Sequence, residues 1–163
     1  MMTRYLGVKI VNAQPMTRQT YNDFRGWELP SDENGNDDGF LIEYLDGGVA
    51  NHASFAGYVS WSPAGVFINA YRSVTDMTFG QAVEALKKGL KVARAGWNGK
   101  SMFVFLVPGS TFQVNRAPLL GIYPDGTQIN YQPHIDMKTA QDMVVPWAAS
   151  QSDVLSEDWM IVE

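Results

Sequence analysis

The C-terminal half of this chain provides one helical segment and then only short apolar segments, each ended by a turn. Thr78 and Gln81 have the spacing of a capping box, apolar residues recur at helical intervals after them, and Gly89 stands where a C-cap glycine belongs. The turns are Pro108-Gly109 and Pro124-Asp125-Gly126. Short strands are predicted at Leu90–Ala93, Met102–Val107, Gln128–Tyr131, Met143–Pro146 and Trp159–Val162. A helix followed by short strands predicts an α+β fold with an antiparallel sheet.

The N-terminal half has a different order of elements. We expect a helix behind Pro15 and Thr17, a loop over Glu28–Gly39, and a short helix after Ser62-Pro63. Strands are predicted at Tyr5–Val11 and Phe40–Leu45. A brief connection over Ser73–Asp76 separates this half from the next. The pattern predicts two small domains, residues 1–74 and 75–163.

Composition excludes several classes of protein. The 163 residues include no cysteine, which excludes a disulfide framework and a thiolate metal site. The apolar fraction is 45% and the charged fraction 18%, as in globular domains. A net charge of −5 argues against binding of duplex DNA. No apolar run reaches the length of a membrane span, so we expect a soluble, intracellular protein with no membrane contact.

Positive charge is concentrated in one stretch. Between Glu84 and Asp125 the chain carries six basic residues and no acidic one: Lys87, Lys88, Lys91, Arg94, Lys100 and Arg116. Cations interleaved with aromatic rings suit a ligand that has phosphates and bases. The alternative is that the lysines form a solvated helix face and the aromatic rings belong to the core.

Metal and catalytic motifs are weak. The residues at the ligand offsets of a calcium loop are Asp32, Asn34, Asn36, Asp38 and Glu43. Asp37 stands where that loop needs glycine, and a strand follows in place of a helix, so a solvated acidic loop is expected. The two histidines, His52 and His134, have no zinc-site spacing. No nucleophile elbow, P-loop or dinucleotide fingerprint occurs, and we predict no enzymatic activity and no cofactor.

The segment Arg94–Lys100 and the strand after it give the strongest binding signal. Trp97 lies between Gly96 and Gly99, which predicts an indole presented on a loop. Phe103 and Phe105 share one face of the following strand and Val104 the other, and either face suits a core. Arginine suits phosphate, carboxylate suits ribose hydroxyls, and amide suits purine edges. The predicted ligand-binding residues are Arg94, Trp97, Asn98, Phe103, Asn115, Arg116, His134 and Asp136.

Residues 76–163 resemble the phage Thoeris anti-defence family of the second type. The matching sequence segments are Met77–Gly80, Ala93–Lys100, Phe103–Ser110, Val114–Leu119, His134–Met137, Val145–Trp147 and Ser150–Asp153 with Glu157–Trp159. Residues 1–74 resemble a second family, small phage proteins of unknown function. The segments that match it are Tyr5–Gly7, Pro15–Arg18, Gly26–Leu29, and Gly57-Tyr58 with Ser60–Pro63.

The first resemblance implies a sponge that binds cyclised ADP-ribose immune signals without cleaving them. Some members of that family also hold the cyclic oligonucleotides of CBASS defence. It further implies a homo-oligomer, expected here to be a tetramer, acting in the cytoplasm of the infected host. In this reading Trp97 and Phe103 stack on bases, Arg94 and Arg116 meet the pyrophosphate, and Asp136 meets a ribose. The alternatives are a phosphodiesterase or glycohydrolase that degrades the signal, and an oligomeric accessory protein without a ligand.

Overall fold

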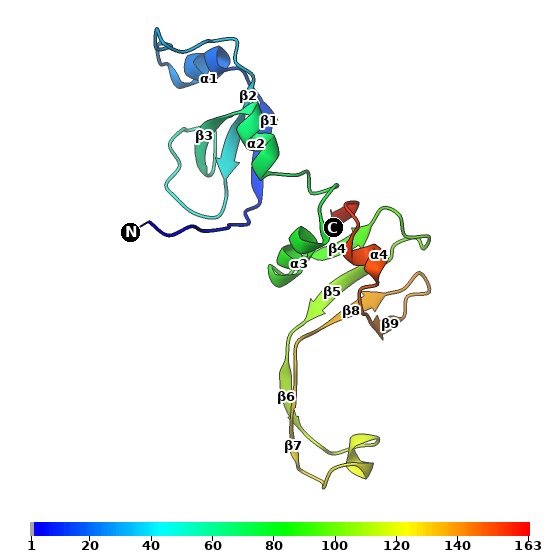
Figure 1. The fold of residues 1–163 in the computed structure, drawn as a ribbon. Coiled ribbons are helices and arrows are strands. Elements are labelled where there is room, and N and C mark those ends of the chain that lie inside the picture. The colour runs from blue at the N-terminus through cyan, green and yellow to red at the C-terminus, as the bar shows by residue number, and fades with distance from the viewer. Residues whose placement is uncertain (1) are drawn as a thin grey trace. The chain divides into compact units, whose positions relative to one another are not determined.

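The computed structural model describes residues 2–163. The chain forms two compact units, Met1–Arg72 and Ser73–Glu163 (Figure 1). Both units combine short helices with antiparallel strands, so the predicted α+β class is confirmed. In the described part of the chain, no helix has the length and apolar character needed to cross a membrane.

The N-terminal unit is a three-stranded sheet with two helices. The strand order is β1-β2-β3. Its elements are β1 (Val11–Pro15), α1 (Arg18–Arg25), β2 (Gly39–Tyr44), β3 (Tyr58–Pro63) and α2 (Ala64–Ala70). Helix α1 begins at Thr17, whose side chain accepts from the Thr20 amide, and ends at Gly26 with a φ of 68°. Both expected helices of this half are therefore present.

The strand predicted at Tyr5–Val11 is wrong. Strand β1 begins where that prediction ends, because Val11 is the first residue that pairs with β2, opposite Tyr44. Apolar side chains before it are exposed: Tyr5 is 91% and Leu6 99% exposed. Strand β3, which is not among the strands predicted from the sequence, has buried Val59 alternating with serines. It pairs with the preceding strand β2 across the loop of residues 45–57.

The C-terminal unit is built on a five-stranded sheet of order β10-β4-β5-β8-β9, with a separate pair β6-β7. Its strands are β4 (Lys91–Arg94), β5 (Phe103–Val107), β6 (Ser110–Gln113), β7 (Gln128–Tyr131), β8 (His134–Lys138), β9 (Val144–Pro146) and β10 (Trp159–Val162). Its helices are α3 (Phe79–Lys87), α4 (Gln151–Val154) and the 3-10 turn η1 (Leu119–Gly121).

Helix α3 has the ends that the sequence predicts. The Thr78 side chain accepts from the Gln81 amide, and the Gln81 side chain accepts from the Thr78 amide, which completes the capping box. Gly89 has a φ of +83°, a left-handed conformation that suits glycine after a helix. These local signals fix where α3 starts and stops.

One face of the five-stranded sheet carries the core of this unit. Val92, Val104 and Trp159 are fully buried there against Ala82 and Leu86 of α3. Since side chains alternate along a strand, Phe103 and Phe105 lie on the opposite face. The question that the sequence leaves open is therefore answered: the face of Val104 is the core face.

Strands β6 and β7 form an arm that continues from β5 and β8, with η1 in the loop at its tip (Figure 1). Tyr131 pairs with Ser110 at its base and Gln128 with Gln113 near its tip. The tip loop folds around Val114, which is 1% exposed and exchanges backbone hydrogen bonds with Gly126 and Thr127. Strands β6 and β8 are not among the strands predicted from the sequence.

Candidate functional site

The candidate site is the sheet face that points away from α3, named here the outer face. The strand register places on it the alternate residues of five strands. They are Lys91, Ala93, Phe103, Phe105, Val107, His134, Asp136, Lys138, Val144, Pro146, Met160 and Val162. The register therefore brings three of the predicted binding residues together: Phe103, His134 and Asp136.

Two ammonium groups flank the Phe103 ring. Lys91 Nζ lies 5.2 Å from the ring centroid and Lys138 Nζ lies 6.0 Å from it, both within cation–π range. Lys138 is also held by Asp142 Oδ1 at 2.6 Å and by the Ser101 carbonyl at 3.3 Å. The outer face thus presents an aromatic ring next to positive charge, an arrangement that suits a base and a phosphate in one ligand.

His134 and Asp136 supply polar groups two residues apart on β8. His134 Nδ1 lies 3.0 Å from the Gln132 carbonyl, and its Nε2 lies 3.7 Å from Asp136 Oδ1. Asp136 Oδ1 is buried and has no hydrogen-bond partner among residues 2–163. A buried carboxylate oxygen without a donor is costly. A ligand hydroxyl that donates to this oxygen would remove that cost.

Arg94 lies outside this group, on the core side of β4. Its Nε donates to Asp158 Oδ1 at 2.8 Å and its Nη1 donates to Asp153 Oδ1 at 3.0 Å. The hydrogen bond to Asp158 is the main reason that the pKa of Arg94 is raised, and the same bond lowers the pKa of Asp158. The guanidinium already has carboxylate partners, so this structure does not present it to a phosphate.

The prediction of a presented Trp97 indole is wrong. The side chain is half-buried and packs edge-on against Trp159 and Trp147, with ring centroids 5.5 and 6.2 Å apart. Its Nε1 donates to Asp153 Oδ1 at 3.3 Å. Glycines on both sides permit a loop, but the distant tryptophans provide an apolar surface that the indole covers. The predicted stacking of Trp97 on a base of the ligand is not tested by these contacts and stays a prediction.

The other predicted residues are placed apart from the outer face. Asn98 is exposed in the loop between β4 and β5. Asn115 and Arg116 are exposed in the loop between β6 and β7. This loop forms the tip of the arm (Figure 1). Within a single chain, Asn98, Asn115 and Arg116 therefore do not lie on the face that carries Phe103.

Sequence reasoning missed Lys91 and Lys138 as site residues. Lys138 stands two residues after Asp136 and so shares its face, which is a signal once β8 is identified as a strand. Lys91 reaches Phe103 only through the pairing of β4 with β5, which no local pattern gives. Among residues 2–163, no group of three or more histidine, aspartate or glutamate side chains is placed to hold a metal ion.

Comparison with known proteins identifies the segment that carries the outer face. The family described as Thoeris anti-defense 2-like domain matches residues 77–162, more than half of the chain. The chain is also 42% identical over 88 residues to "Thoeris anti-defense 2" of Bacillus phage SP01, an alignment that covers 54% of this chain and 97% of that protein. The resemblance of residues 76–163 to the Thoeris anti-defence family is thereby confirmed. This chain belongs to the Thoeris anti-defense 2-like family.

Proposed function

We propose that this phage anti-defence protein is a sponge: it binds cyclised ADP-ribose immune signals in the host cytoplasm and does not cleave them. Residues 75–163 would form the signal-binding domain and residues 1–74 an accessory domain. Sequestration requires only that free signal stays below the level that activates the bacterial effector. A cyclic ligand favours tight binding because its ring has lost conformational freedom before it binds.

The observation that carries the proposal is that Phe103, His134 and Asp136 share the outer face with Lys138 and with Lys91, whose ammonium group lies over the Phe103 ring. In the proposed complex a base stacks on Phe103 and the ammonium group of Lys91 meets the pyrophosphate, while Lys138 keeps its ion pair with Asp142. Asp136 Oδ1 accepts from a ribose hydroxyl and gains the donor it lacks. Each part of the ligand then meets a group of matching chemistry.

The decisive experiment recovers the ligand from the protein. The full chain is incubated with a cyclised ADP-ribose, freed of unbound ligand and heat-denatured, and the supernatant is analysed by mass spectrometry. We expect intact ligand. Cleaved ligand would indicate the phosphodiesterase or glycohydrolase alternative, and an empty supernatant would indicate an accessory protein without a ligand. The same assay with cyclic di- and trinucleotides tests the wider ligand range.

Replacing Lys91 by methionine tests the site without disturbing the fold. Methionine keeps an unbranched apolar side chain on β4 and removes the charge next to Phe103. We expect affinity for the cyclised ADP-ribose to fall by about five- to tenfold, with a smaller difference at high salt. The matched control is Lys88→Met, which removes the same charge at the exposed end of α3. Equal affinities for both variants by calorimetric titration would contradict the site.

We further propose that the chain assembles as a homo-oligomer, a tetramer, in which the arm of one copy reaches the outer face of another. A two-stranded hairpin is marginally stable alone in water, and this arm exposes Phe112, Ile122 and Tyr131. The partner's arm would bring Asn115 and Arg116 to the outer face, where the single chain leaves them distant. Light scattering at micromolar concentration should give the mass of an oligomer, and a monomer would rule this assembly out.

A further inference from the structure

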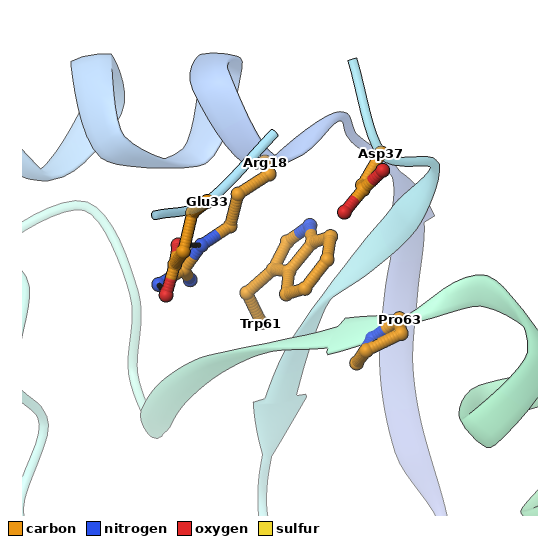
Figure 2. Close-up of a pocket in the computed structure, with 5 residues that line it drawn as sticks. All are labelled: Arg18, Glu33, Asp37, Trp61 and Pro63. Atoms are coloured by element: carbon orange, nitrogen blue, oxygen red, sulfur yellow. Dashed lines mark hydrogen bonds and ion pairs between the residues drawn. The ribbon is translucent and has the colours of Figure 1, made fainter. Parts of the chain in front are cut away.

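The N-terminal unit contains a cavity of about 340 Å³, open to solvent, that the proposed signal site does not use. Arg18, Glu33, Asp37, Trp61 and Pro63 line it (Figure 2). They come from the start of α1, the loop before β2 and the end of β3. All five lie outside the family match over residues 77–162. The volume is within the range of small-ligand sites.

The Arg18–Glu33 pair at one side of the cavity is electrically neutral. Arg18 Nη2 donates to Glu33 Oε1 at 2.9 Å, and Arg18 Nε donates to Glu33 Oε2. This two-point hydrogen bonding raises the pKa of Arg18 and lowers the pKa of Glu33. Since each charge is matched within the pair, neither group is free to bind a ligand ion strongly.

The Trp61 indole forms a fixed wall. Its Nε1 donates to the Met16 carbonyl at 2.8 Å, so the indole has no free N–H to offer a ligand. Gly39 lies against the ring: a Cβ at that position would be 2.3 Å from Trp61 Cζ2, so only glycine fits. The Arg18 guanidinium lies 5.1 Å from the ring centroid, so this ring already stacks with one planar cation of the chain itself.

Asp37 supplies the net charge of the cavity. Asn34 Nδ2 donates to Asp37 Oδ1 at 3.0 Å, and Oδ2 has no hydrogen-bond partner in the described part of the chain. Figure 2 shows the carboxylate turned toward the Trp61 ring. The unit around it is acidic, with five basic and eight acidic residues between Met1 and Arg72. The cavity therefore combines one unmatched carboxylate with an aromatic wall.

We propose that this cavity binds a guanidinium group. A guanidinium is planar, weakly hydrated and stacks on aromatic rings, and it donates two parallel hydrogen bonds to a carboxylate. Trp61 supplies the wall and Asp37 the carboxylate. The arginine side chain of a partner protein and a free guanidinium compound share this chemistry. The inference is independent of the proposed signal binding, because it concerns only residues of the N-terminal unit.

The test titrates the full chain with N-acetylarginine methylamide and follows the indole N–H resonance of Trp61, assigned with a Trp61→Phe variant. We expect a saturable shift and expect Asp37→Asn to weaken binding at least about tenfold. The matched control Asp38→Asn, at a neighbouring carboxylate that does not line the cavity, should bind as the original chain does. Agmatine as a second probe separates the sources, since a partner's arginine predicts tighter binding of the peptide-like probe.

Three results would overturn the inference. One is the absence of a saturable shift with either probe up to about 50 mM, which is weaker than any useful affinity. Another is equal binding of N-acetylcitrulline methylamide, which has the same shape without the charge. The third is equal binding by the Asp37→Asn and Asp38→Asn variants. An unchanged position of the Trp61 indole N–H resonance in the Asp37→Asn variant without probe serves as the folding control of the N-terminal unit.

Discussion

Replacing Asp153 by alanine is expected to lower the free energy of unfolding of the C-terminal unit by about 3–5 kcal/mol. The reason is that one carboxylate serves three structural elements. Its Oδ1 accepts from Arg94 Nη1 and Trp97 Nε1, and its Oδ2 accepts from the Ser150 amide and hydroxyl. The variant leaves the half-buried Arg94 with Asp158 alone and removes half of the capping box of α4. Urea unfolding followed by tryptophan fluorescence measures the loss.

Asp142→Ala is the matched control for this variant. Asp142 also forms an ion pair, with Lys138 at 2.6 Å, but its side chain is 81% exposed whereas that of Asp153 is 11% exposed. An exposed pair contributes at most about 1 kcal/mol, because water and salt screen it. Equal losses for the two variants would show that burial of Asp153 does not matter, and would contradict the predicted role.

The pKa of Asp153 gives the same variant a second readout. Burial alone raises that pKa, but hydrogen bonds from Ser150, Arg94 and Trp97 outweigh the effect and lower it from 3.8 to about 2. A carboxyl group with a lowered folded-state pKa stabilises the fold fully above its ordinary pKa. That stabilisation, about 2 kcal/mol here, is lost as the pH falls from about 4 toward 2. Asp153→Ala should therefore flatten the acid side of the stability curve.

The elements predicted correctly are those whose signals are local. The Thr78–Gln81 box and Gly89 define α3 within a few residues of each end, and β7 and β10 have the predicted bounds. Strand β8 is not among the predicted strands, although its polar residues His134, Asp136 and Lys138 alternate with apolar ones, which is a local strand signal. Its sheet partner β5 lies about thirty residues earlier.

The residues of the candidate site also divide into those that local sequence indicates and those that only strand pairing brings in. Phe103, His134 and Asp136 could be chosen by chemistry from the sequence, and the register of β5 with β8 places them on one face. That Lys91 belongs with them, and that Asn115 and Arg116 lie at the end of an arm, follows from strand pairing across the sheet and along the hairpin. Residue type indicates the chemistry, but non-local pairing decides which residues meet.

Trp97 shows how local reasoning fails. Flanking glycines predict an exposed side chain, but the indole packs on Trp147 and Trp159, which lie fifty or more residues later in the chain. Trp97→Ala is therefore expected to destabilise the C-terminal unit by about 3 kcal/mol, the lower end for a buried tryptophan because the ring is only half-buried. Thermal or urea unfolding measures this loss.

The same variant separates packing from ligand contact when affinity is measured on the folded fraction. Because the indole lies on the core side of the sheet and the proposed site on the outer face, affinity for the cyclised ADP-ribose should stay within about twofold. Trp27→Ala is the control for stability: that side chain lies in the N-terminal unit, so its removal should leave the unfolding of the C-terminal unit unchanged. A Trp97→Ala protein of nearly unchanged stability whose affinity falls tenfold or more would place the ligand against the tryptophan cluster and not on the outer face.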